Sequence, residues 1–93
     1  MAVFDLLGRR WTMRILWELQ SGPLNFRALQ SACGGVSPSV LNTRLKELGQ
    51  ARLIAATGGG YGLTPLSSDL MAKLDPLRTW SKAWDAALKA EKG

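Results

Sequence analysis

Apolar residues recur along this chain at two different spacings, which separate helical from extended segments. Trp11, Ile15 and Leu19 lie four residues apart, the spacing that places side chains on one face of a helix. Gly22-Pro23 predicts the end of this helix, because glycine suits a C-terminal cap and proline cannot continue the backbone hydrogen bonding. Before this helix we expect Asp5-Leu6-Leu7 to form only a short apolar turn.

Two further helices follow, separated by a tight glycine turn. Asn25 is a favourable N-cap for the first of them, and Gly34-Gly35 predicts its end. Ser37-Pro38 predicts the start of the second, since a hydroxyl cap is followed by proline at the first helical position. We expect this second helix over Ser37–Gln50, with one apolar stripe facing the core. The stripe consists of Leu41, Leu45 and Leu48, with Val40 at its border.

The spacing then changes to that of short strands and returns to that of a helix. Leu53–Thr57 and Tyr61–Thr64 are strand candidates, and Gly58–Gly60 between them has the composition of a tight hairpin. Thr64-Pro65 repeats the combination of cap and proline and predicts a last helix. We expect Pro76 to kink this helix or to split it in two.

The order of these elements predicts a mainly α (α+β) fold, a winged helix-turn-helix with a short two-stranded wing and a C-terminal dimerisation helix. The helix-turn-helix would span about residues 25–51, the wing about 53–64 and the last helix about 65–91. A chain of 93 residues is too short for two separate cores, so we expect residues 1–93 to form a single domain.

The exposed face of the Ser37–Gln50 helix carries side chains that suit a DNA groove. Asparagine can bond adenine bidentately, threonine offers a hydroxyl and a methyl group, and lysine or arginine reaches guanine or phosphate. The candidates on this helix are Ser37, Ser39, Asn42, Thr43, Arg44 and Lys46. Any solvated helix face has a similar composition, and Glu47 would repel phosphate if it faced the duplex.

Basic residues outside this helix are further candidates for contacts to phosphate. Arg27 lies on the preceding helix, and Arg9, Arg10 and Arg14 lie near the first one; each also fits ordinary solvated surface charge. The chain has 12 lysines and arginines against 7 acidic residues, a net charge of +5 that suits a polyanionic partner.

The remaining composition argues against several other functions. With no histidine and one cysteine, the chain lacks the usual members of a catalytic, zinc or disulfide site, so we expect no enzyme activity, metal or cofactor. No segment is apolar enough to span a membrane, and the chain does not begin like a signal peptide, so we expect a cytoplasmic protein. Cys33 fits a small buried apolar residue; a thiol sensor there would need exposure and a lowered pKa.

Five segments of the chain carry motifs in a fixed order: Leu7–Thr12, Ile15–Leu19, Gly22–Phe26, Val36–Leu48 and Tyr61–Thr64. Together they resemble the HxlR-type, MarR-like family of winged helix-turn-helix regulators. The family pattern Ile-Ser-x-x-x-Leu-x-x-Arg-Leu-x-x-Leu is similar to Val36–Leu48, and Tyr-x-Leu-Thr is similar to the end of the wing. Trp80 falls where the last helix of the family often carries tryptophan.

The resemblance implies a prokaryotic homodimeric regulator of transcription that binds double-stranded DNA, and analogy with the family favours a repressor. The sequence does not identify a small-molecule effector. Each partner's Ser37–Gln50 helix would enter a major groove, about one turn or ~34 Å from the other. The resemblance assigns five residues to the dimer interface: Phe4, Leu7, Leu77, Trp80 and Trp84. The alternative for the two tryptophans is that they fold back onto their own protomer.

Three departures from the family pattern qualify this resemblance. The chain lacks the cysteine that many members carry before the first helix, its wing is short and without a basic tip, and Arg52 stands where a glycine usually ends the recognition helix. Arg52 would then be able to add a phosphate contact. The short wing and Glu47 also keep open an alternative function, a winged-helix protein-interaction module without DNA binding.

Overall fold

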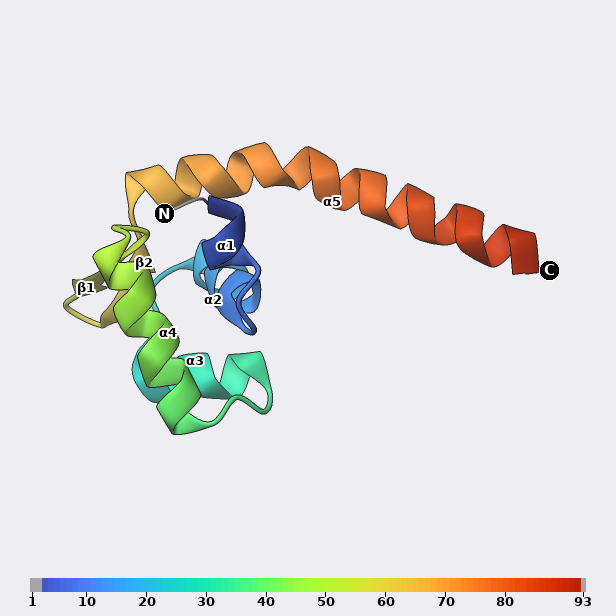
Figure 1. The fold of residues 1–93 in the computed structure, drawn as a ribbon. Coiled ribbons are helices and arrows are strands. Elements are labelled where there is room, and N and C mark those ends of the chain that lie inside the picture. Colours follow the sequence, from blue (N-terminus) through green and yellow to red (C-terminus); the bar gives the residue numbers. More distant parts are fainter. Residues whose placement is uncertain (1–2, 93) are drawn as a thin grey trace.

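A small helical body, a hairpin and one long helix that leaves the body make up the structure (Figure 1). The computed structural model describes residues 3–92, so the first two residues and the last residue of the predicted domain lie outside it. The elements are α1 (Val3–Leu7), α2 (Thr12–Glu18), the 3₁₀ turn η1 (Leu19–Ser21), α3 (Phe26–Cys33), α4 (Pro38–Gln50), β1 (Ile54–Thr57), β2 (Gly60–Leu63) and α5 (Pro65–Lys92). This order confirms the predicted winged helix-turn-helix.

The helix-turn-helix is formed by α3 and α4, and side chains cap the start of both helices. Asn25 Oδ1 accepts a hydrogen bond from the Ala28 N–H at 2.8 Å, and Ser37 Oγ accepts one from the Val40 N–H at 3.2 Å. Each bond satisfies an N–H group that has no partner within the helix. Between the helices, Gly34 adopts a left-handed conformation with φ 67°, which glycine reaches without steric cost.

The core joins one face of each helix to the base of the hairpin. Ile15, Leu29 and Leu41 are fully buried in it, and burying a side chain of this size contributes about 1.5–3 kcal/mol. The buried apolar residues are Leu6, Ile15, Leu16, Leu19, Leu29, Cys33, Val36, Leu41, Leu45, Leu48, Leu53, Ile54 and Met71. The predicted leucine stripe of α4 therefore holds this helix to the body by its inner face.

The wing is an antiparallel hairpin in which Ile54 pairs with Leu63 and Thr57 with Gly60. It is fastened to the body by a bridge between Leu24 and Tyr61, whose backbone groups exchange hydrogen bonds of 2.8 and 3.0 Å. Gly60 lies directly against this bridge with φ 142°, and a Cβ there would lie 2.3 Å from the Leu24 carbonyl oxygen. A glycine is therefore required at this position.

The last helix, α5, starts on the body and then runs beyond it. Its first turn is held by Ser67, a fully buried residue whose Oγ donates to the carbonyl oxygen of Leu53. From Asp75 onward every described side chain is exposed, and Figure 1 shows the second half of the helix projecting away from the other elements. No helix within residues 3–92 combines the length and the apolar character needed to cross a membrane.

Several predicted boundaries require correction. The segment predicted as a short turn at Asp5 is a helix, α1, since the Gly8 N–H bonds to the Phe4 carbonyl and Leu6 is buried. Pro76 does not split α5, which continues through it and bends only gently in Figure 1. Because Ala72 and Pro76 are both exposed, water can hydrate the carbonyl that loses its hydrogen bond to the proline.

The strands are also placed slightly differently from the prediction. They span Ile54–Thr57 and Gly60–Leu63, so Leu53 and Thr64 lie outside the ladder. Thr64 instead caps α5: its hydroxyl donates to the Arg52 carbonyl at 2.8 Å and accepts from the Ser67 N–H at 3.3 Å. The hairpin is thus one residue shorter at its open end than the apolar pattern indicates.

Candidate nucleic-acid interface

Four of the predicted contact residues share the outer face of α4. Ser39, Asn42, Thr43 and Lys46 are all exposed, and their spacings of three and four residues place them on adjacent turns of one helix face. The Thr43 hydroxyl donates to the Ser39 carbonyl oxygen at 3.0 Å, which fixes its orientation and leaves its lone pairs free to accept. This face combines donors, acceptors and one exposed cation, Lys46.

Ser37 lies at the N-terminal edge of this face, where its side chain already has a partner. Its Oγ accepts the Val40 N–H and lies 3.4 Å from Ser39 Oγ. The residue thus stabilises the start of α4, and its place beside the free N–H groups of the first turn favours a nearby anion.

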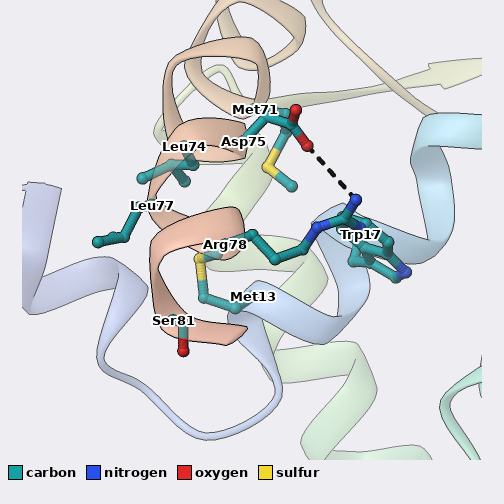
Figure 2. Close-up of a pocket in the computed structure, with 8 residues that line it drawn as sticks. All are labelled: Met13, Trp17, Met71, Leu74, Asp75, Leu77, Arg78 and Ser81. Carbon is teal, nitrogen blue, oxygen red and sulfur yellow. Dashed lines mark ion pairs between the residues drawn. The ribbon is translucent and has the colours of Figure 1, made fainter. Parts of the chain in front are cut away.

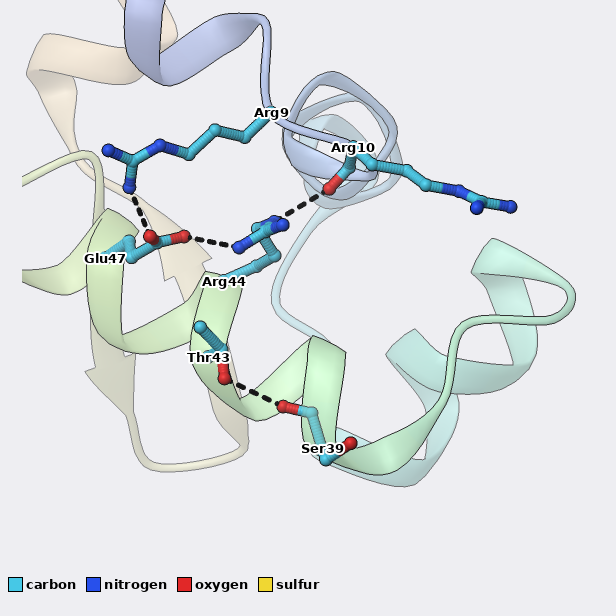
Figure 3. A network of polar contacts seen from close by, with 6 residues as sticks. All are labelled: Arg9, Arg10, Ser39, Thr43, Arg44 and Glu47. Carbon is cyan, nitrogen blue, oxygen red and sulfur yellow. Dashed lines mark hydrogen bonds and ion pairs between the residues drawn. The ribbon is translucent and has the colours of Figure 1, made fainter.

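Arg44 is separated from the other candidates by the direction of its side chain. Its Nε donates to the Arg10 carbonyl oxygen at 2.8 Å, and its Nη1 donates to Glu47 Oε1 at 2.9 Å. Only 20% of the side chain is exposed, and Figure 3 shows it reaching toward the turn between α1 and α2. The structure therefore places Arg44 between two elements of the protein, away from the outer face.

Glu47 lies between two arginines in the same network. Its second carboxylate oxygen pairs with Arg9, so the two oxygens bind guanidinium groups from different parts of the chain (Figure 3). Arg9 and Glu47 are 38 positions apart, and no helical or strand spacing relates them, which is why sequence reasoning did not find this pair. The acidic charge that counted against DNA binding is balanced within the protomer.

The other basic candidates divide into a side chain that bonds to other elements and two side chains that are exposed. Arg14 donates to Glu18 at 3.0 Å and to the Ala32 carbonyl oxygen at 3.0 Å, so it joins α2 to the end of α3. Arg10 is exposed, with its guanidinium 5.6 Å from the Trp11 ring centre and directed away from α4 in Figure 3. Arg27 is exposed on α3. Arg10 and Arg27 thus remain available to phosphate.

Cys33 occupies a buried position at the end of α3. Its side chain is 3% exposed, and burial raises the pKa of its thiol, an effect that the charge of nearby Arg14 opposes. A thiol sensor requires exposure and a lowered pKa. The structure provides neither, and the surroundings of Cys33 fit a packing role.

A second surface, apolar and exposed, follows α1 and the projecting half of α5. Phe4 is 79% exposed and Leu7 is half-buried, while Leu77, Trp80 and Trp84 are 58%, 59% and 52% exposed. The rings of Trp80 and Trp84 are stacked, with centroids 5.7 Å apart. They do not fold back onto the protomer, so that alternative is wrong. We call this set the α1/α5 apolar surface.

A pocket of about 240 Å³ borders this surface between α2 and α5 (Figure 2). The guanidinium of Arg78 lies 4.1 Å from the centre of the Trp17 ring, and Asp75 pairs with Arg78 at 3.5 Å. No pattern in the sequence predicts this pocket. Its lining residues are Met13, Trp17, Met71, Leu74, Asp75, Leu77, Arg78 and Ser81.

Comparisons with known proteins agree with this architecture. The sequence model described as HxlR-like helix-turn-helix matches residues 6–89. The chain belongs to the HxlR-like helix-turn-helix family. It is 30% identical to an uncharacterized HTH-type transcriptional regulator of Methanocaldococcus jannaschii, over 94% of this chain and 86% of that protein.

Solved structures of HxlR-like regulators share the fold as well. Quinone-bound YodB from Bacillus subtilis superposes with a TM-score of 0.81 at 31% identity, covering 86% of this chain and 91% of that one. A possible HxlR family transcriptional factor from Thermoplasma volcanium superposes with a TM-score of 0.80 at 30% identity, covering 92% and 84%. The family and the names of its members make this chain a helix-turn-helix transcriptional regulator.

Proposed function

We propose that this HxlR-like protein binds a specific double-stranded DNA sequence as a homodimer, with α4 in the major groove, and represses transcription. The observation that carries the proposal is the outer face of α4. Its inner leucines are buried, while Ser39, Asn42, Thr43 and Lys46 form a continuous polar face on the helix that the family uses in its helix-turn-helix.

The side chains on this face have distinct roles in the proposal. Asn42 reads a base edge, since an asparagine amide can bond adenine bidentately, and Lys46 binds guanine or phosphate. Ser39 and Thr43 add hydroxyl contacts. Ser37 and the first N–H groups of α4 bind a phosphate at the helix N-terminus.

The surrounding charges support a polyanionic partner. Glu47 is balanced by Arg9 and Arg44, which removes one of the two reasons for a protein-interaction module that does not bind DNA. Arg10 and Arg27 are exposed and fit contacts to the phosphate backbone, which position a protein on the duplex without reading its sequence.

The α1/α5 apolar surface supports the homodimer. Stacked tryptophans that are more than half exposed leave a large apolar area in water, and burying each ring in a partner would contribute on the order of 2–3 kcal/mol. A symmetric dimer presents two copies of α4, which suits an operator with two related half-sites. Repression rests on analogy within the family.

Selection from a randomised duplex library tests the proposal. We expect the purified protein to enrich two inverted half-sites, roughly 10 bp apart between their centres. The Asn42→Ala variant should lose the preference at the base pair that Asn42 reads, while Gln20→Ala, an exposed amide on η1, should enrich the same sites as the unmodified protein. Failure of the unmodified protein to enrich any sequence would contradict sequence-specific binding.

A further inference from the structure

A polar network joins α4 to the turn that follows α1. In this network, which we call the Glu47 clamp, Glu47 pairs with Arg9 and Arg44, and Arg44 also donates to the Arg10 carbonyl oxygen at 2.8 Å. Figure 3 shows Glu47 and Arg44 on one side of α4, both facing the Gly8–Trp11 turn. The clamp thus holds the C-terminal half of the recognition helix against a different part of the chain.

The turn that receives the clamp is itself closely fixed to α1 and α2. Two hydrogen bonds join the turn to α1: the Gly8 N–H donates to the Phe4 carbonyl oxygen at 2.9 Å, and the Arg9 N–H donates to that of Leu6 at 3.2 Å. A third joins it to the start of α2, where the Thr12 N–H donates to the Arg9 carbonyl oxygen. A shift of α1 therefore carries the Arg9 and Arg10 backbone with it. Through the clamp, the same shift acts on α4.

This arrangement bears on the proposed dimer because α1 carries part of the α1/α5 apolar surface. Phe4 is 79% exposed, only one helical turn before Gly8. When a second copy binds this surface, the clamp sets the direction of α4 relative to the dimer axis. The distance and angle between two such helices decide which separation of half-sites both can reach.

We propose that Arg9, Arg44 and Glu47 are positioning residues that determine the half-site spacing accepted by the dimer, without themselves reading bases. This inference rests on the proposed function. Each of the three side chains is at most 36% exposed, and their charged groups are directed at one another or at the Arg10 carbonyl. The outer face of α4 reads the sequence, and the clamp fixes where that face is presented.

The test measures spacing preference with charge-matched variants. Glu47→Gln breaks the ion pairs of the clamp, while Glu18→Gln breaks the pair of Glu18 with Arg14 on α2 and changes the net charge by the same amount. The probes are duplexes that hold the half-sites selected by the unmodified protein, with their separation varied one base pair at a time. Thermal unfolding of each variant checks that it is folded.

The expected result is a loss of spacing discrimination confined to the clamp. Glu47→Gln should reduce the preference for the best spacing over its neighbours roughly threefold to tenfold, with unchanged base preference inside each half-site. Arg9→Ala should act in the same direction and Arg9→Lys should largely restore the preference, since lysine keeps the charge. Glu18→Gln should match the unmodified protein.

Two outcomes would overturn the inference, and they differ from each other. If Glu47→Gln and Arg9→Ala remain folded and keep the spacing preference of the unmodified protein, the clamp does not set the spacing although the proposed function stands. If the unmodified protein selects no half-sites, the proposed function fails and the inference fails with it.

Discussion

The wing can pack against the body only because residue 60 is a glycine. An added Cβ would lie 2.3 Å from the Leu24 carbonyl oxygen and 2.6 Å from the Asn25 backbone, and neither can move without breaking the Leu24–Tyr61 bridge. We expect Gly60→Ala to lower the free energy of unfolding by roughly 2–3 kcal/mol. Chemical denaturation measures this loss. Gly59→Ala is the control, since a Cβ there meets nothing within 4 Å; equal effects of both substitutions would contradict the steric reason.

Arg52 adopts a backbone conformation that favours glycine. It has φ 61°, and it follows the end of α4, where the Leu53 N–H bonds to the Leu48 carbonyl at 2.9 Å. The left-handed conformation costs a residue with a side chain about 1–2 kcal/mol of stability, which a glycine would recover. Glycine also makes the unfolded chain more flexible, and this offsets about 0.4–1 kcal/mol of the recovered stability. We therefore expect Arg52→Gly to raise the free energy of unfolding by roughly 0.5–1 kcal/mol. Unchanged or lower stability in urea titrations would refute this reason.

Cys33 should make stability depend on pH in the alkaline range. Burial raises the pKa of its thiol above the ordinary value of 9.0, so the folded protein binds this proton more tightly than the unfolded chain does. The resulting stabilisation is fully present below pH 9.0 and is lost as the pH rises through the folded-state pKa. We expect the denaturation midpoint to fall more steeply above this pH than in Cys33→Ala, whose other titrating groups are the same. Parallel curves for the two proteins would exclude this effect.

The caps could be predicted at the residue scale, whereas the clamp could not. Asn25 and Ser37 act on N–H groups three residues ahead, so the local sequence contains all of the interaction. Glu47 meets Arg9 only because the chain folds back over 38 positions. From the sequence alone Glu47 is a charge that opposes DNA and Arg44 is a candidate contact to it, while the structure gives both a partner inside the protomer.

At the scale of elements, α5 carries the prediction that bears most directly on the homodimer. Trp80 and Trp84 are stacked and more than half exposed on the part of the helix that projects from the body. We expect the double variant Trp80→Ala/Trp84→Ala to raise the dimer dissociation constant at least about 1000-fold, because the two lost rings of one protomer alone remove about 4–6 kcal/mol of apolar burial.

Sedimentation equilibrium measures that dissociation constant. Lys82→Ala provides the control, since Lys82 is exposed on the same stretch of α5 and is not an apolar residue. A double variant that associates as tightly as the unmodified protein, or an unmodified protein that stays monomeric at high concentration, would contradict the assignment of this surface to the dimer.

Among the elements, the helices that begin with a cap residue followed by proline could be predicted well from the sequence. The start of α4 at Ser37-Pro38 and the start of α5 at Thr64-Pro65 agree with the structure, since cap and proline act locally. Helix α1 could not be predicted because five residues are too few to show a helical period, and its stability depends on burying Leu6. The pocket between α2 and α5 arises from the packing angle of two helices, which no local pattern contains.

At the scale of the whole molecule, the two proposed surfaces lie on different parts of one protomer. The molecule measures 49 × 26 × 25 Å because α5 projects beyond the body, while α4 lies on the body itself (Figure 1). A second copy can therefore bind along α5 and leave α4 free. This division allows dimerisation and DNA binding at the same time, as the proposed function requires.

The most direct test of DNA recognition by α4 is a fluorescence-anisotropy titration at two salt concentrations. The probe is a labelled duplex from the DNA upstream of the protein's own gene, and the proteins are the unmodified chain, Lys46→Ala and Lys89→Ala. Both variants remove one exposed lysine, but Lys89 lies near the end of α5 and pairs with Asp85 at 2.9 Å. We expect saturable binding that weakens steeply with salt, and an affinity that falls in Lys46→Ala far more than in Lys89→Ala. Absence of saturable binding at low salt, or an equal response of the two variants, would contradict recognition of DNA through α4.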